Sequence, residues 1–397
     1  MQSHFFTRNR QALMELTSAK IGVLAGHISV QRSNDAAFAF TQEANFWYLT
    51  GIEAAGWVLI MTDQKSYLVA PDVDEVHLIF DGSLSFDQAK HVSGVDEVLS
   101  YAAGEMLLEE LVYAHKTVAS IAKDPHGQHY DFAMNPGPIA MYERLEKLFE
   151  SVEDCRSNLA SLRAIKQPEE IAALRSAIAL TVAGFEMVKR DFSAYRHEYE
   201  IEADFTHHFR RSGAAGHAYD PIVAAGKNAC TLHYGKNQSE LTDGQLVLID
   251  VGAQLQGYPA DITRTYAHGS LTDRQRAVHA AVEQAHYEII ALLRPGLDVQ
   301  QYSAMVDEIM KKALDNLGLL QSAADYRKYF PHAISHGLGI DVHDSLGGPK
   351  AFQVGMVLTV EPGIYIPEEG IGVRIEDDIL ITESGHENLS QQLPTSL

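Results

Sequence analysis

The stretch GQLVLIDVGAQLQGYPADITRTY, residues 244–266, predicts two antiparallel β-strands joined by a turn. Its LVLI run has high strand propensity, and a glycine marks the turn. If the turn is centred between Leu255 and Gln256, Asp250 lies directly opposite Asp261, with the two Cβ atoms ~5 Å apart. Two carboxylates at that separation repel each other, so this register predicts a cation between them. A solvated pair of acids at the mouth of the hairpin is the alternative.

A second stretch, TVEPGIYIPEEGIGVRIEDDILI, repeats this arrangement. A turn centred on its two adjacent glutamates pairs Glu361 with Glu376, and both follow apolar strand residues. Arg374 lies two residues before Glu376, so the period of a strand places the two on one face. Asp378 shares that face, whereas Asp377 faces away. We interpret both aspartates as surface acids or as supports of the site.

Four carboxylates carry a charge of −4, which two divalent cations would neutralise, and oxygen donors suit ions such as Mn²⁺. One imidazole would complete a mixed site, and the segment HAISHGLGIDVHD, residues 332–344, supplies three. His332 and His336 have the spacing of a zinc-protease HExxH helix, but alanine replaces its glutamate and two glycines disfavour a helix. His336 is therefore the expected ligand, and His343 and His233 are expected to donate hydrogen bonds to a substrate carbonyl. The two glycines would let the backbone pass close to the centre.

The region before these motifs has a different pattern. Short apolar segments alternate with amphipathic helices from about residue 20 to 149, which predicts a layered α/β domain. We place the domain boundary near residue 158, giving an N-terminal α/β domain, 1–158, and a second domain, 159–397.

The second domain repeats one architecture without repeating its sequence. Two predicted helices precede the strands of each hairpin, so we expect a duplicated α+β domain. The expected helices are 168–192 and 198–212 for the first hairpin, and 272–293 and 299–317 for the second.

The composition and charge of the chain limit the classes of function that can be expected. With 31 basic and 53 acidic residues the net charge is −22, which disfavours binding to nucleic acid or to an anionic membrane. The N-terminus lacks the apolar core of a signal peptide, and no run approaches the roughly 18 apolar residues of a membrane span. The two cysteines, Cys155 and Cys230, lie far apart without CxxC spacing, as in a reducing compartment. We expect a cytoplasmic protein.

Five segments taken together resemble the pita-bread metallopeptidases, namely Xaa-Pro aminopeptidase (aminopeptidase P) and its relative prolidase. These segments are LHYGKN, LVLIDVGAQLQGYPADITRTY, HAISHGLGIDVHD, MVLTVEPGIYI and GVRIEDDILIT. The resemblance covers most of residues 160–390. FFTRNRQAL and FTQEANFWYLTG extend it to the N-terminal domain of the same group.

The resemblance implies a fold and a set of site residues. The fold is an α/β N-terminal domain followed by a duplicated α+β pita-bread catalytic domain. The implied ligands of two metal ions are Asp250, Asp261, His336, Glu361 and Glu376. The other implied site residues are His233 and His343 at the reacting carbonyl, His332 in the substrate pocket, Arg374 beside the last ligand, and the site-lining Tyr219 and Tyr365. Glu361 is also the expected proton carrier, and Ala333 replaces the usual glycine.

The expected activity is that of a hydrolase which releases the first residue from peptides that have proline second. Its implied cofactors are two divalent ions, Mn²⁺ above all, with Co²⁺, Zn²⁺ or Fe²⁺ as alternatives. A homodimer or homotetramer is the expected assembly. Two other functions stay open: a prolidase that cleaves only Xaa-Pro dipeptides, and a binding module of this fold without catalysis.

Overall fold

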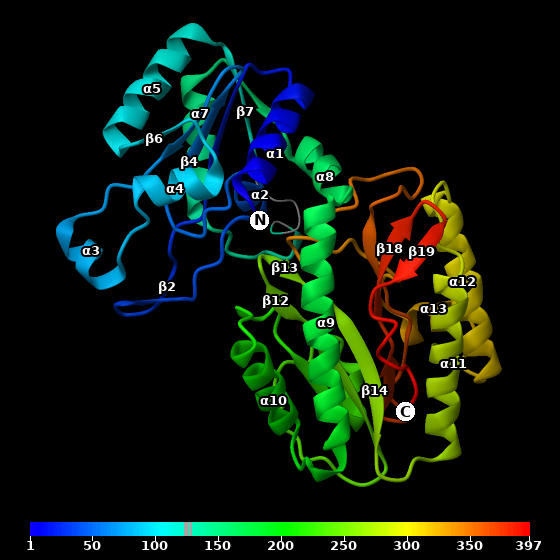
Figure 1. Cartoon of the computed structure of the whole chain (residues 1–397). Coiled ribbons are helices and arrows are strands. Elements are labelled where there is room, and N and C mark those ends of the chain that lie inside the picture. Colours follow the sequence, from blue (N-terminus) through cyan, green and yellow to red (C-terminus); the bar gives the residue numbers. More distant parts are fainter. Residues whose placement is uncertain (123–126, 128) are drawn as a thin grey trace. The chain divides into compact units, whose positions relative to one another are not determined.

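The computed structural model describes residues 1–122, 127 and 129–397, which form two compact units (Figure 1). Unit 1 is Met1–Leu162 and unit 2 is Arg163–Leu397. The helix α8 (Arg156–Ala164) contains both this division and the predicted boundary at residue 158. The domain limits 1–158 and 159–397 stay a prediction.

Unit 1 is a layered α/β structure, as predicted. A six-stranded mixed sheet runs in the order β6-β5-β4-β1-β7-β8. Its strands are β1 (Ile21–Ala25), β4 (Val58–Thr62), β5 (Ser66–Val69), β6 (Glu97–Leu99), β7 (Thr117–Ser120) and β8 (Ser151–Asp154). The helices with described bounds are α1 (Ser3–Leu16), α2 (Ala44–Thr50), α3 (Glu75–Asp81), α4 (Phe86–Ser93), α5 (Tyr101–Ala114) and α7 (Pro136–Leu148). A short hairpin, β2 (Gln31–Ser33) and β3 (Ala36–Ala37), stands apart from the sheet.

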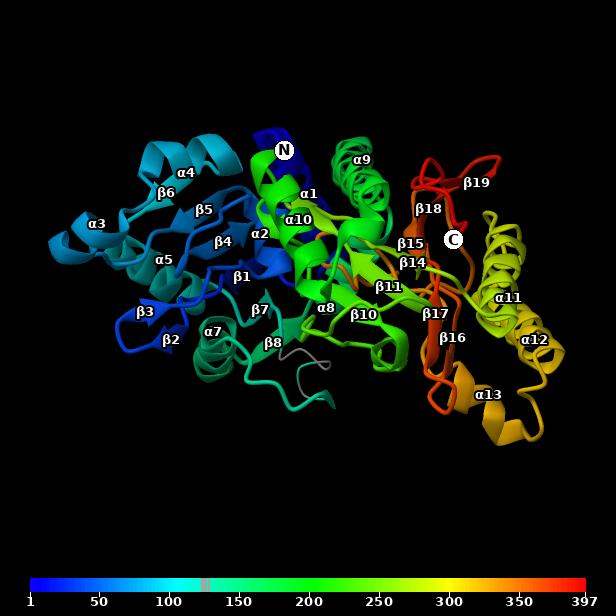
Figure 2. The same cartoon turned by 90° about the horizontal axis from the view of Figure 1, so that it is seen from below.

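Unit 2 contains the predicted repeat of two helices followed by strands, with one further short helix before the strands of the second half. The first half has α9 (Pro168–Arg190), α10 (Glu198–Arg211), β9 (Gly216–His217), β10 (Ile222–Ala225), β11 (Gln245–Val251), β12 (Ala253–Leu255), β13 (Tyr258–Pro259) and β14 (Ile262–His268). The second half has α11 (Asp273–Ile290), α12 (Val299–Asn316), α13 (Ala323–Tyr329), β15 (Val357–Val360), β16 (Gly363–Ile366), β17 (Ile371–Arg374), β18 (Asp377–Thr382) and β19 (Gly385–Asn388). The strands lie between the helix pair α9 and α10 and the pair α11 and α12 (Figures 1 and 2).

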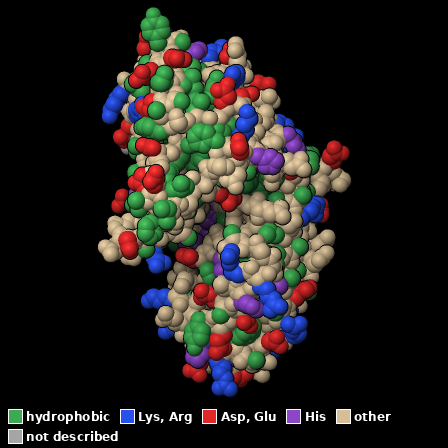
Figure 3. All heavy atoms as spheres, turned by 60° about the vertical axis from the view of Figure 1, so that its left-hand side comes forward, with side chains coloured by type: hydrophobic (Ala, Val, Ile, Leu, Met, Phe, Trp, Pro, Cys, Tyr) green, Lys and Arg blue, Asp and Glu red, His purple; other side chains and the backbone are tan. Residues whose placement is uncertain are grey.

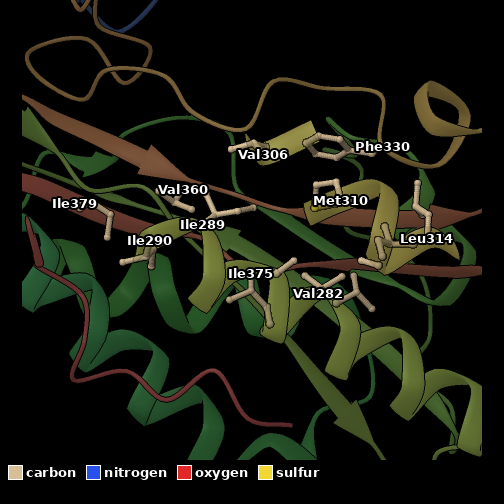
Figure 4. Close-up of a cluster of buried hydrophobic side chains, with 14 of the residues drawn as sticks. Val282, Ile289, Ile290, Val306, Met310, Leu314, Phe330, Val360, Ile375 and Ile379 are labelled. Carbon is tan, nitrogen blue, oxygen red and sulfur yellow. The ribbon is translucent and has the colours of Figure 1, made fainter. Parts of the chain in front are cut away.

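The main core of unit 2 explains why α11 and α12 lie against the strands. Apolar residues at helical spacing on both helices meet alternate residues of the second-half strands (Figure 4). They include Val282 and Ile289 from α11, Met310 from α12, and Val360 and Ile379 from the strands, and all of these are buried. This packing fixes the strands that carry the second pair of carboxylates.

The register predicted for the first hairpin is wrong by two residues. Asp250 pairs with Thr263, not with Asp261, because the turn is centred between Gln256 and Gly257. Both turn residues have positive φ, 55° and 82°, as a two-residue type I′ turn requires. A shift of two residues preserves the face on which a side chain lies, so Asp250 and Asp261 still point to the same side.

The register predicted for the second hairpin is confirmed. Gly363 pairs with Arg374 in β16–β17, and Val360 pairs with Asp377 in β15–β18, as expected for a turn at the two adjacent glutamates. Glu361 and Glu376 lie where both ladders break. The backbone N–H of Glu376 donates instead to Thr263 O at 3.1 Å, which joins the two hairpins.

The helix α9 has the length and composition of a membrane-spanning helix, but its contacts are those of a core helix. Among the described residues α9 alone is long and apolar enough to cross a membrane by length and composition, and half of the relevant window is buried in the chain. Its buried residues include Glu170, which accepts a hydrogen bond from Tyr258 Oη, and Thr181, which accepts one from Ala253 N. These contacts are those of a core helix, which starts at Pro168 with a capping box from Gln167.

Candidate metal centre

Side chains from both hairpins and from the histidine segment meet in unit 2. Among the described residues, three overlapping groups each bring potential ligand atoms within 4.8 Å of one another. The groups are Asp250 with Asp261 and Glu376, His336 with Glu361 and Glu376, and Asp261 with His336 and His343. The structure therefore brings together all five residues predicted as metal ligands. Their role as ligands stays a prediction.

Breaks in the strands point the carboxylates at one place. Asp250 is in β11, Asp261 directly precedes β14, and Glu361 and Glu376 occupy the junctions β15–β16 and β17–β18. His336 belongs to an irregular segment that runs beside β15. There the backbone N–H of Thr359 donates to His336 O at 2.9 Å, and that of Glu361 donates to Ile334 O at 3.0 Å. This pairing places the imidazole among the carboxylates.

The electrostatics of the cluster favour a bound cation. Burial and the neighbouring carboxylates raise the pKa of Glu376 well above its usual value, and burial also raises the pKa of Asp250. Burial raises the pKa of Glu361 to about 7. Within the described part of the chain, Arg374 is the one buried guanidinium that forms an ion pair with these four acids, so their charge is only partly balanced. Oxygen donors with one imidazole fit a hard or borderline divalent cation.

Arg374 organises one side of the cluster. Its guanidinium donates to Asp250 Oδ2 at 2.5 Å, to Tyr365 Oη at 3.0 Å and to Thr263 Oγ1 at 3.2 Å. Thr263 in turn donates to Glu376 Oε2 at 2.6 Å. Thr263 therefore connects Arg374 to Glu376, and Arg374 also reaches Asp250 of the opposite hairpin.

Two predicted tyrosines lie at the cluster. Tyr219 Oη is 2.6 Å from Asp250 Oδ1 and 2.7 Å from Asp261 Oδ1, so it bridges the two aspartates of the first hairpin. Tyr365 Oη is 2.9 Å from His332 Nε2. Tyr219 therefore contacts two predicted ligands, whereas Tyr365 contacts His332 and Arg374, and the site-lining roles of both tyrosines stay predictions.

The histidines differ in environment. Burial, with the positive charge of Arg374, lowers the pKa of His332 to about 3, so its imidazole is neutral. His336 loses some basicity by burial, but its hydrogen bond to Asp261 and the charges of Asp261 and Glu361 raise its pKa to about 9. His343 is exposed, with its ring centroid 4.2 Å from that of His336.

His233 is an exposed residue in a loop that Glu198 holds. The buried Glu198 carboxylate accepts hydrogen bonds from Ala225 N, Asn228 Nδ2, Tyr234 Oη and Ser239 N, at 2.8–2.9 Å. Sequence reasoning missed Glu198, whose signal is an acid in the first turn of a helix that precedes the LHYGKN motif.

Of the two interpretations of Asp377 and Asp378, surface acids or supports of the site, the first is wrong, since their exposed fractions are 2% and 0%. Asp378 Oδ2 accepts the backbone N–H of Asp261 at 3.2 Å. Asp377 pairs with Arg264, a fully buried arginine that sequence reasoning also missed. Its signal is a cation inside the apolar strand ITRTY. These residues support the backbone on which the ligands sit.

Two family models match the chain. Metallopeptidase family M24 matches residues 172–383, which contain the whole carboxylate and histidine cluster, and the aminopeptidase P N-terminal domain matches residues 6–119. The chain belongs to metallopeptidase family M24. The M24 match confirms the resemblance to the pita-bread metallopeptidases and the fold class that it implied.

Two solved structures and one sequence of Escherichia coli relatives match over nearly their full lengths. Xaa-Pro aminopeptidase of Escherichia coli is 34% identical over 423 residues, which cover 97% of this chain and 94% of that protein. A low-pH structure of E. coli aminopeptidase P superposes with a TM-score of 0.88 at 33% identity, covering 100% of this chain and 96% of that one. A Zn-substituted E. coli aminopeptidase P in complex with product gives 0.86 at 32% identity, with coverage of 100% and 96%.

Proposed function

We propose that this chain is a metal-dependent Xaa-Pro aminopeptidase, which hydrolyses the bond between an N-terminal residue and a penultimate proline. The observation that carries this function is the convergence of four carboxylates and His336 at the strand junctions of an M24 fold. The full-length similarity to E. coli Xaa-Pro aminopeptidase supports the substrate class. Nothing in these comparisons favours a prolidase.

We further propose two Mn²⁺ ions as the cofactors, held by Asp250, Asp261, His336, Glu361 and Glu376. Two divalent cations balance four carboxylates. Divalent cations bound there would act as Lewis acids toward the substrate carbonyl and would lower the pKa of a water molecule at the site.

Glu361 is the proposed proton carrier of the reaction. It takes a proton from the attacking water and delivers it to the proline nitrogen as the carbon–nitrogen bond breaks. One Glu361 oxygen lies 3.5 Å from His332 Nδ1 and the other 3.7 Å from His336 Nε2, so the carboxylate borders both the ligand cluster and the proposed substrate side.

The remaining site residues bind and orient the peptide. His343 and His233 are both exposed, and in this proposal each offers an N–H to the oxygen that gains charge during attack. His332, which is neutral, contacts the substrate without adding charge. Tyr219 and Tyr365 line the pocket, and Arg374 keeps Asp250 in place through its ion pair.

We also propose a homodimer or homotetramer in the cytoplasm. The helix α3, every residue of which the structure describes, buries none of its side chains. Ile79 and Phe80 in this helix are each 82% exposed, and hydrophobic side chains gather on the face of unit 1 seen in Figure 3. An exposed apolar patch of this kind fits a contact with a second copy. Cys155 and Cys230, both in the described part of the chain, are free thiols, as expected in a reducing compartment.

A peptide panel with added Mn²⁺ tests the proposed function. We expect release of the N-terminal residue from Xaa-Pro-Pro tripeptides, and no cleavage of matched peptides with alanine in place of the second residue. If only the dipeptide Gly-Pro were cleaved, the activity would be that of a prolidase and not of an aminopeptidase. A protein that binds no metal and cleaves no peptide would instead be a binding module.

A further inference from the structure

A buried ion cluster holds the loop that carries His336 and His343. Arg163 Nη2 lies 2.8 Å from Asp344 Oδ1, and Lys166 Nζ lies 3.4 Å from Asp344 Oδ2. The exposed fractions of the three side chains are 6% for Arg163, 0% for Lys166 and 2% for Asp344. Two buried cations therefore converge on one buried carboxylate, an arrangement that is stable only while the charges stay paired.

The position of Asp344 connects this cluster to the histidines. Asp344 directly follows His343, and Gly337 directly follows His336. The backbone N–H of Asp344 donates to Gly337 O at 2.8 Å. The segment from His336 to Asp344 is thus a closed loop with one histidine near each end. The two imidazoles lie 4.2 Å apart between ring centroids, so the base of the loop sets their separation.

The two glycines of the loop make room for Asp344. A Cβ atom on Gly339 would lie 1.7 Å from Asp344 Oδ2, and one on Gly337 would lie 2.4 Å from Asp344 O. Either distance is too short for real atoms, so the loop closes over the carboxylate only with glycine at both positions. The need for space around Asp344 explains the presence of the two glycines better than our expectation that they let the backbone pass close to the metal centre.

We propose that Asp344 is a positioning residue for the peptidase reaction. Held by Arg163 and Lys166, it fixes the loop so that His336 faces the carboxylate cluster and His343 faces the substrate. The inference rests on the proposed function for its kinetic consequence. Its structural consequence, the placement of His336, can be measured by metal binding alone.

The test compares Asp344→Asn with the matched variant Asp341→Asn. Asp341 pairs with the same arginine, with Arg163 Nη2 2.5 Å from Asp341 Oδ2, but its side chain is 55% exposed. We expect Asp344→Asn to reduce the affinity for Mn²⁺, or to lower kcat, by about 10- to 100-fold, as for groups that orient metal ligands. Asp341→Asn should stay within about twofold of the parent, as for an exposed ion pair. Chelator competition measures the affinity, so a protein without peptidase activity still gives an answer.

Two further variants separate positioning from stability. Gly339→Ala keeps every charge but displaces the Asp344 carboxylate, so it should reproduce the Asp344→Asn defect. Lys166→Met combined with Asp344→Asn removes an unpaired buried cation and should recover part of the thermal stability. We expect metal affinity and kcat to stay low in this double variant. Recovery of both together with stability would overturn the proposal, and so would parent values of both in Asp344→Asn or in Gly339→Ala.

Discussion

Replacing Glu376 with glutamine is expected to reduce kcat/KM by more than about 100-fold while leaving the fold intact. Groups that only orient metal ligands are worth about 10- to 100-fold, so loss of a ligand should cost more. The amide has the shape of the carboxylate, and its oxygen still accepts the hydrogen bond from Thr263 Oγ1. Because Asp261 and Glu361 repel the Glu376 carboxylate, the metal-free variant should unfold at the same temperature as the parent or higher.

The matched control is Glu383→Gln, which makes the same change at an exposed position of the same strand region. Metal content after gel filtration, kcat/KM and the melting temperature should all equal those of the parent in this control. If Glu376→Gln retained full metal content and normal turnover, Glu376 would not be a ligand.

Replacing Arg264 with methionine is expected to destabilise the protein by about 3–5 kcal/mol, because it leaves a buried carboxylate unpaired. Arg264 is fully buried and its guanidinium lies 2.7 Å from Asp377 Oδ1. It also donates to Glu376 O at 2.8 Å and to Leu393 O at 2.8 Å, which ties the C-terminal segment to a predicted ligand. While Arg264 is present, burial lowers the pKa of His286, which lies 3.4 Å from Asp377, to about 4, so Arg264 is the charged partner of this carboxylate.

Denaturant unfolding of unit 2 measures this loss in the free energy of unfolding. Arg190→Met is the control, since Arg190 is 72% exposed and pairs with Asp191 at 3.6 Å, and it should change the free energy of unfolding by less than about 0.5 kcal/mol. Adding Asp377→Asn to Arg264→Met should recover part of the loss. A destabilisation equal to that of Arg190→Met would show that the buried pair contributes little.

The two hairpins show what sequence determines about this fold. The register of the second hairpin was predicted correctly from a turn centred on its two adjacent glutamates, whereas the first register was wrong because Gln256 adopts positive φ beside Gly257. Propensity does not reveal which non-glycine residue enters the left-handed region. The face of each carboxylate was still correct, because a shift of two residues preserves strand parity.

Four of the five predicted ligands could be found because they are acids that follow apolar strand residues, and His336 could be found because it lies in a segment with three histidines. Arg264, Glu198 and Asp344 were missed as supports, because each acts through partners distant in the sequence. Arg163 and Asp344, for example, come together only when the start of unit 2 folds against the histidine loop. Burial, which distinguishes Asp344 from Asp341, is a property of the tertiary structure.

Metal titration of chelator-treated protein tests the central claim most directly. Release of the N-terminal residue from an Xaa-Pro-Xaa tripeptide is followed as Mn²⁺ is added, with bound metal measured in parallel. We predict no release without metal, and a rise that saturates as two ions bind per chain. Release that is unaffected by removal of the metal, or no release at any Mn²⁺ concentration, would contradict the assignment of this centre.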